Sequence, residues 1–302
     1  MSKMAKFIFS RQEKLYLSVK DEKVMAWIGI LGIVLGAICL VIILFKGSVT
    51  PPEGDLFKAV SFNVALGIFA ITTAFLLPFS TFRPKSRSIL RWSIIFLTLY
   101  SYSIETIQHL RGLNPRFSTS AGPLDIIFGA LFGLFSIAIV IYYVIISINF
   151  FRKRTKVSRP LLVSGIRYGM LSTFIAFIGG LWMIALQGRY FGDSGNIIWL
   201  HGLAFHGLQI IPLIALLTEK TILSEKLKRR WIHISGVSWL SALLIIGIQT
   251  GIGISIFQIS IPSVLALCLI GITATIFLQL LRSVIITKHI SVTEGKKEFT
   301  EG

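Results

Sequence analysis

The segment SIETIQHLRG, from Ser103 to Gly112, places a carboxylate, an imidazole and a guanidinium at the end of a strongly apolar run. Glu105 and His109 are four residues apart and therefore share one face of a helix, with Gln108 close beside them. Ionisable groups are costly in hydrocarbon, so a membrane helix that keeps them usually has a use for them. A carboxylate beside an imidazole suits acid–base chemistry, metal binding or recognition of a polar ligand.

A second polar helix is expected in GDSGNIIWLHGLAFHGLQIIPLIALL, residues 192–217. His206 lies about 15 Å along this helix from Asn196, near the middle of a bilayer, and Gln209 shares its face. His201 points elsewhere, since five residues rotate a helix by about 140°. Pro212 interrupts the backbone hydrogen bonding of the same helix.

These helices must be held by a membrane bundle, because the composition excludes a soluble domain. Hydrophobic residues make up 54% of the 302 residues and charged residues only 14%, against about a quarter charged in soluble domains. A membrane-spanning helix needs about 20 apolar residues. Eight such runs lie near 24–46, 57–80, 90–110, 123–150, 160–186, 196–217, 232–252 and 260–282. The sequence therefore predicts an all-α, polytopic transmembrane helix bundle.

The Lys and Arg residues that give the net charge of +17 lie mainly in every second connection between the apolar runs. With the N-terminus inside, 25 of the 30 Lys and Arg residues fall on the inner side, as the positive-inside rule requires. We therefore expect both termini in the cytoplasm, a chain in the cell membrane, and anionic lipid at the basic inner loops. Nucleic acid is not needed to explain the charge.

The expected organisation is one bundle, 24–284, between a cytoplasmic N-terminal segment, 1–23, and a cytoplasmic tail, 285–302. No motif is shared between the first four and the last four apolar runs, so no internal repeat is predicted. Both polar helix ends open on the outer side, where polar connections adjoin them. The predicted outward-facing pocket comprises Glu105, Gln108, His109, Arg111, Arg116, Asp125, Arg189, Asp193, His201, His206 and Gln209.

Several of these residues also have a purely structural interpretation. Arg111 suits an anchor at the membrane interface, and Asp193 and Asn196 suit caps of the following helix. Glu105 can pair with a His or Arg simply to join two helices, and we expect its partner to come from another span. His206 needs one donor and one acceptor, and Glu105, Gln108 or Asp125 are the expected partners.

The segment IETIQHLRGLNPRFS and the later GD…H…HGLQIIPL helix resemble an uncharacterised family of bacterial multi-pass membrane proteins. That family has an outer-side Q..RG segment and a later GD…H….H.LQ..PL helix. The matching residues are Gln108, Arg111, Gly112, Asp125, Gly192, Asp193, His201, His206, Gln209 and Pro212. Arg116, Phe117 and Ser118 stand where the family has a tetrapeptide with His and Asn, so any role of that His is absent here. The resemblance implies no particular reaction.

Three classes of function remain open on sequence alone. The first is a protein that binds, senses or transports a small polar or lipid-linked solute. The alternative is a membrane-embedded enzyme acting from the outer face, with acid–base groups or zinc held by Glu105, His206 and either His109 or His201. The third is a single-haem redox protein with His109 and either His201 or His206 as axial ligands.

Overall fold

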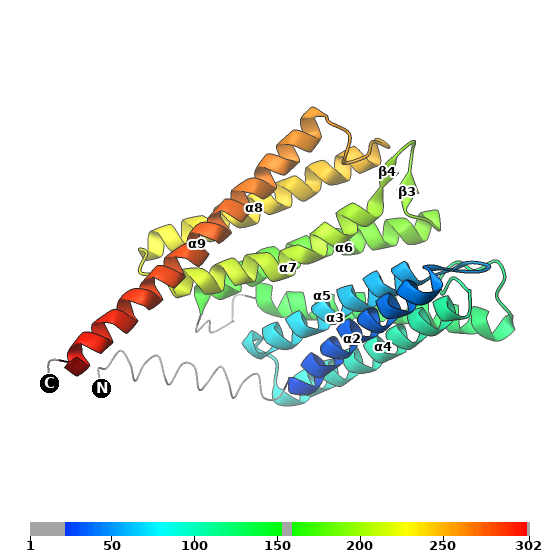
Figure 1. Cartoon of the computed structure of the whole chain (residues 1–302), viewed down its shortest axis with the longest axis horizontal. Coiled ribbons are helices and arrows are strands. Elements are labelled where there is room, and N and C mark those ends of the chain that lie inside the picture. The colour runs from blue at the N-terminus through cyan, green and yellow to red at the C-terminus, as the bar shows by residue number, and fades with distance from the viewer. Residues whose placement is uncertain (1–21, 153–158, 301–302) are drawn as a thin grey trace. The chain divides into compact units, whose positions relative to one another are not determined.

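The computed structural model describes residues 22–152 and 159–300 (Figure 1). This part of the chain contains eight α-helices, one short 3-10 helix and two hairpins of two-residue strands. The all-α class is therefore confirmed. The chain divides between Thr155 and Lys156 into two compact units, each with its own packed helices.

The first unit is centred on α4. Its elements are α2 (Lys23–Lys46), β1 (Val49–Thr50), β2 (Gly54–Asp55), α3 (Leu56–Leu76), η1 (Leu77–Phe79), α4 (Pro84–Leu110) and α5 (Pro123–Phe151). α2 and α3 form the most extensive contact, and α4 packs against α2, α3, α5 and β2. Prolines begin α4 and α5, since the first helical position needs no N–H donor.

The second unit repeats this order of elements. It contains α6 (Pro160–Leu186), β3 (Tyr190–Phe191), β4 (Gly195–Asn196), α7 (Ile197–Glu219), α8 (Glu225–Gly251) and α9 (Ile261–Thr300). α6 packs mainly on α7, and α8 packs against α6, α7, α9 and β4. The chain is therefore built from two structurally similar halves, which the sequence did not predict.

The repeat extends to individual backbone hydrogen bonds, always 141 residues apart. The Glu53 N–H donates to the Gly112 carbonyl at 2.8 Å, and the Ser194 N–H donates to the Gly253 carbonyl at 2.9 Å. The glycines at these positions have φ values of +82° and +79°, which other residues rarely adopt. At Gly112 an added Cβ would lie only 2.0 Å from the Pro51 carbonyl oxygen. Close backbone contact, rather than side-chain identity, defines the repeat.

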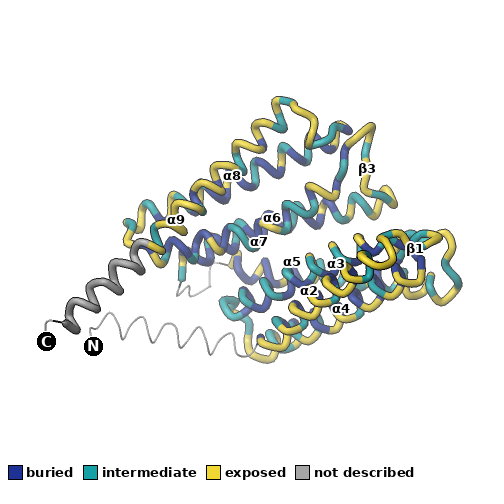
Figure 2. Tube along the Cα trace, viewed as in Figure 1, coloured by how far each residue is buried: buried dark blue, intermediate teal, exposed yellow. Residues whose placement is uncertain are grey.

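Many positions along the helices of both units are exposed (Figure 2), and a large number of them carry large apolar side chains. Leu44 and Phe45, for example, are 82% and 83% exposed. Within residues 22–152 and 159–300, seven helices are long and apolar enough to cross a membrane: α2, α3 with η1, α5, α6, α7, α8 and α9 up to Ile285. A multi-pass membrane architecture is thereby confirmed.

α4, which contains the expected run 90–110, is long but too polar to be among the seven. Most polar residues of its second half face inward: Thr98, Ser101, Tyr102, Glu105, Gln108 and His109 are buried, whereas Ser103 is exposed. Its exposed face carries large apolar side chains, among them Trp92, Phe96 and Ile107. This inside-out distribution is typical of a helix surrounded by hydrocarbon rather than water.

Glycines bring α2 and α3 into close contact. A Cβ added to Gly29 would lie 2.6 Å from the Gly67 carbonyl oxygen, and one added to Gly67 would lie 2.5 Å from that of Gly29. The predicted N-terminal segment 1–23 lies almost entirely outside the described residues. α9 continues as a helix through most of the predicted tail, to Thr300.

Candidate functional site

The candidate site lies at the hairpin end of the first unit, where α4 ends. The Asp55 backbone N–H donates to His109 Nδ1 at 3.1 Å, so Nδ1 is unprotonated. A neutral His109 with this bond carries its proton on Nε2. The imidazole is fully buried, and its Nε2 is 3.4 Å from Glu105 Oε1. The hairpin thus selects the tautomer that presents an N–H to the carboxylate.

Glu105 is fully buried and forms its ion pair with Arg116. Arg116 Nη2 donates to Glu105 Oε2 at 2.7 Å. The partner comes from the connection between α4 and α5, whereas we expected it from another span. Asn114 directs this connection back toward α4, because its Oδ1 accepts the backbone N–H groups of Arg116 and Phe117.

Two aromatic rings hold the Arg116 guanidinium. Its Cζ lies 5.1 Å from the ring centroid of Phe62 on α3 and 5.3 Å from that of Phe132 on α5. Both distances are within the range of cation–π attraction. The side chain is 32% exposed while its partner Glu105 is 0% exposed. Arg116 therefore connects a buried carboxylate to the surface of the unit.

A second polar group joins the last turn of α4 to the first turn of α5. Asp125 Oδ1 accepts hydrogen bonds from Arg111 Nη1 at 2.6 Å and from Gln108 Nε2 at 2.9 Å. Arg111 Nη1 also donates to Gln108 Oε1 at 3.1 Å. Arg111 thus does more than anchor a helix end at the interface. It completes a triangle of side chains that fixes the orientation of Asp125.

Glu53 is a site residue that the sequence analysis missed. Its Oε1 accepts the Thr119 N–H at 2.8 Å and the Thr119 hydroxyl at 2.6 Å. Hydrogen bonds from the Ser118 hydroxyl and from Thr119 lower the pKa of this carboxyl from 4.5 to about 2. Glu53 therefore fastens the α4–α5 connection to the hairpin. An acidic residue among the turn residues PPEGD was the only signal in the sequence.

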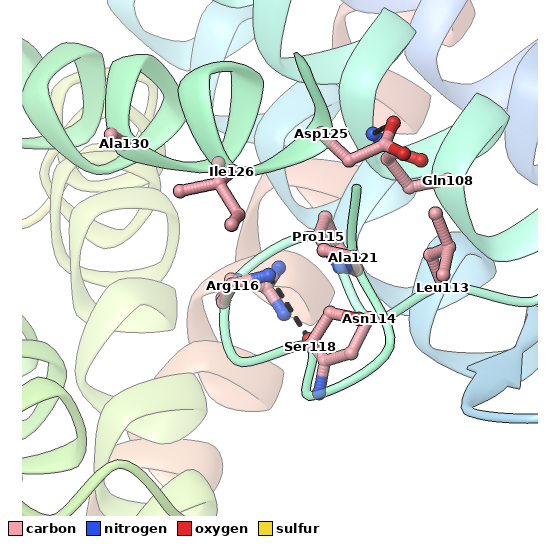
Figure 3. Close-up of a pocket in the computed structure, with 11 residues that line it drawn as sticks. Gln108, Leu113, Asn114, Pro115, Arg116, Ser118, Ala121, Asp125, Ile126 and Ala130 are labelled. Carbon is pink, nitrogen blue, oxygen red and sulfur yellow. Dashed lines mark hydrogen bonds between the residues drawn. The ribbon is translucent and has the colours of Figure 1, made fainter. Parts of the chain in front are cut away.

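A pocket of about 260 Å³ opens between this connection and α5 (Figure 3). Its polar lining comes from Gln108, Asn114, Arg116, Ser118 and Asp125, and its apolar lining from Leu113, Pro115, Ala121, Ile126, Gly129 and Ala130. The polar set contains three of the residues expected from the sequence. Glu105 and His109 do not line the pocket, and Arg116 contacts both the pocket and Glu105.

Several buried polar atoms near the site have no hydrogen-bond partner among the described residues. They are Asn63 Oδ1, Tyr102 Oη, Glu105 Oε1 and His109 Nε2. Asn63 Nδ2 donates to Thr106 Oγ1 at 2.8 Å, which joins α3 to α4. Such groups are costly to bury. The interior of the first unit therefore contains buried polar atoms that no hydrogen bond among the described residues satisfies.

The remaining predicted residues lie in the second unit. His201 Nδ1 is 2.7 Å from the Ala176 carbonyl oxygen and joins α7 to α6. Asn196 caps α7 by accepting the Ile198 N–H at 3.2 Å, as expected, whereas Asp193 lies exposed in the turn between β3 and β4. His206 is exposed and Gln209 is half-buried on α7.

Arg189, also in the second unit, contacts the residue next to it. Its guanidinium lies 5.1 Å from the centroid of the Tyr190 ring and donates to the Tyr190 hydroxyl at 3.2 Å. The described pocket therefore contains residues of the first unit only. A pocket that combines both polar helices stays a prediction.

The second unit builds the equivalent scaffold without the charges. At the constant spacing of 141 residues, Ser194, Ile246 and Thr250 stand in place of Glu53, Glu105 and His109. Gln249, in place of Gln108, holds the α8–α9 connection by donating to the Ser255 carbonyl at 2.7 Å and to Ser263 Oγ at 2.9 Å. Neutral polar groups are thus sufficient for this fold.

In the described part of the chain, no three His, Cys, Asp or Glu side chains are grouped closely enough to hold a metal ion. The expected zinc set is divided, since Glu105 and His109 belong to the first unit and His201 and His206 to the second. Both candidate haem pairs likewise take one histidine from each unit. The zinc and haem assignments stay predictions.

Comparison of the chain with protein-family models, with curated proteins and with solved structures finds no match. The resemblance to an uncharacterised membrane family therefore stays a prediction. The functional assignment rests on the geometry of the site.

Proposed function

We propose that this multi-pass membrane protein binds a small polar solute in the pocket beside the α4–α5 connection, for sensing or transport. Arg116 supplies the main recognition group, and Gln108, Asn114, Ser118 and Asp125 complete the polar lining. A mostly apolar pocket with a few convergent polar groups is the usual form of a small-molecule site.

The observation that carries this proposal is the difference between the two units. Both make the same backbone contacts between hairpin and connection, yet only the first has a buried carboxylate and imidazole, Glu105 and His109, at the end of its central helix. If these charges served only to join helices, the second unit would need them too. Its Ile246 and Thr250 support the proposal that Glu105 and His109 serve a function other than joining helices.

In this proposal the protein lies in the cell membrane with eight spans and both termini inside. The buried polar face and exposed apolar face of α4 support its assignment as the eighth span. The distribution of basic residues among the connections supports hairpin ends on the outer side and a pocket that opens outward. The inner connections, which carry most of the Lys and Arg residues, would contact anionic lipid.

An enzyme is the second candidate, because the Glu105–His109 pair has the composition of an acid–base dyad. Neither residue lines the pocket and both are fully buried, whereas Arg116 lines the pocket and pairs with Glu105. A solute in the pocket would meet Arg116 first. This arrangement favours binding over acid–base catalysis on the bound solute.

The proposal is tested with the full chain in lipid nanodiscs, by measuring melting temperature against a panel of small anions, cations and neutral solutes. A ligand raises the melting temperature of the protein that binds it. We expect at least one solute to stabilise the unmodified protein but not Arg116→Gln. Arg189→Gln is the matched control, since it removes an arginine beside an aromatic ring in the other unit. Stabilisation that is equal in all three proteins would contradict the pocket.

The absorption spectrum and zinc content of the same sample address the other classes. A haem absorption band would favour the redox function, and stoichiometric zinc would favour the enzyme. We expect neither to accompany solute binding at Arg116.

A further inference from the structure

The Arg116 guanidinium has unused hydrogen-bonding capacity. Of its five N–H donors, only one on Nη2 has an acceptor in the described part of the chain, Glu105 Oε2. The side chain is 32% exposed and lines the pocket. The Phe62 and Phe132 rings contact the guanidinium and supply no acceptor. An occupant of the pocket therefore meets several unpaired donors.

The acceptors of the pocket, by contrast, are already engaged. Asp125 Oδ1 accepts from Gln108 and Arg111, and Asp125 Oδ2 accepts from Arg111 at 3.3 Å. Gln108 Oε1 also accepts from Arg111. A ligand that only donates hydrogen bonds would have to share these acceptors with Gln108 and Arg111. A ligand that accepts them can bind Arg116 without disturbing Asp125.

We propose that the ligand carries an oxyanion, a carboxylate or a phosphate, and that it binds by taking the Arg116 guanidinium from Glu105. This inference rests on the proposed function and names the class of its ligand. The planar guanidinium matches both oxyanions and binds them through two parallel hydrogen bonds. The contact with Glu105 uses only one such bond within hydrogen-bond distance, so a bidentate ligand competes effectively.

Glu105 then acts as a built-in competitor that weakens binding. It is fully buried, and its Oε1 has no hydrogen-bond partner among the described residues. Among the described residues, Arg116 is its only cationic partner when His109 is neutral. The nearby charges are paired elsewhere, Lys58 with Asp55 at 3.7 Å and Arg111 with Asp125 at 2.6 Å. Loss of Arg116 to a ligand therefore leaves the carboxylate uncompensated, and binding is opposed.

The test measures the dissociation constants of inorganic phosphate and acetate by calorimetry, with the full chain in phosphatidylcholine nanodiscs at constant ionic strength. We expect Glu105→Gln to bind at least one of these anions about tenfold more tightly than the unmodified protein, within the usual range of coupling between two sites. Glu105→Ile is a second neutral variant, because the second unit has Ile246 at this position. Arg116→Gln should lose binding, and Arg189→Gln should retain it.

Nanodiscs that contain phosphatidylglycerol distinguish a lipid headgroup from a free anion. If the headgroup phosphate occupies the pocket, this lipid should weaken binding of soluble phosphate in the unmodified protein and have no effect in Arg116→Gln. Without such competition the ligand is a free anion, and Arg116-dependent binding of phosphate or acetate still supports the inference.

If folded Glu105→Gln and Glu105→Ile bind anions no more tightly than the unmodified protein, Glu105 does not compete with the anion for Arg116. If ammonium or a neutral solute binds in an Arg116-dependent way and neither anion binds, the ligand does not carry an oxyanion. The proposed solute site would still stand. If no solute of any charge binds in an Arg116-dependent way, the proposed function itself fails. Melting temperatures of all variants establish that each is folded.

Discussion

The Asp55 backbone N–H donates to His109 Nδ1 at 3.1 Å and joins the β1–β2 hairpin to the last turn of α4. Thr250 occupies the position 141 residues later in the second unit, and its buried hydroxyl has no hydrogen-bond partner among the described residues. At equivalent positions of the two units, the His109 imidazole therefore accepts a backbone hydrogen bond and the Thr250 hydroxyl makes none among the described residues.

This difference predicts unequal effects of two alanine substitutions. His109→Ala leaves the Asp55 N–H without its acceptor and opens a cavity beside Glu105, so we expect a loss of about 2–4 kcal/mol in unfolding free energy. Thr250→Ala removes a hydroxyl that satisfies no partner, so we expect a change within about 1 kcal/mol. Unfolding in mixed micelles measures both. Equal losses in the two variants would show that the hairpin bond is unimportant.

Glu53 predicts an acid-dependent loss of stability at the connection. Its pKa is about 2 in the folded chain, below the ordinary 4.5, so folding favours the ionised carboxylate. The stabilisation is complete above about pH 4.5 and is lost as the pH falls toward 2. We expect the melting temperature to fall more steeply over this range in the unmodified protein than in Glu53→Gln. Parallel curves would assign the acid sensitivity to other groups.

The sequence predicted the helices well and their polar contacts poorly. The expected runs 123–150 and 160–186 agree closely with α5 and α6, because a proline begins each helix and a polar segment follows it. Such features depend on neighbouring residues in the sequence, namely an apolar run with a proline at its start and polar residues after its end. The contact of Glu53 with Thr119 spans 66 residues, and such a pairing depends on the path of the chain, which hydrophobicity does not specify.

The repeat was missed for a related reason. Lipid-facing positions accept many apolar side chains, so the two halves can share an order of elements and equivalent backbone hydrogen bonds with few identical residues. Identical residues at the spacing of 141 include Gly54 and Gly195, Gln108 and Gln249, and Gly112 and Gly253. Two of these pairs are glycines at close backbone contacts, where no other residue fits. A search restricted to such positions would have found the repeat.

The assignment of α4 as a span predicts which connections are accessible from outside. With α4 spanning, the α4–α5 connection lies outside and the α7–α8 connection inside. Ser120 and Lys220 are exposed in these two connections. The native thiols Cys39 and Cys268 are first replaced by serine, and Ser120→Cys or Lys220→Cys is then introduced. We expect a membrane-impermeant maleimide to label Ser120→Cys on intact cells.

Lys220→Cys should react only after the membrane is opened, and it serves as the control for leakage of the reagent. A reporter fused after Gly302 adds an independent test, since both termini are expected inside. If Ser120→Cys is protected on intact cells, or the fusion is active only outside, the pocket does not face outward. The arginine and its buried carboxylate would then meet solutes of the cytoplasm. Anion binding in nanodiscs, where both faces are accessible, would be unchanged by that result.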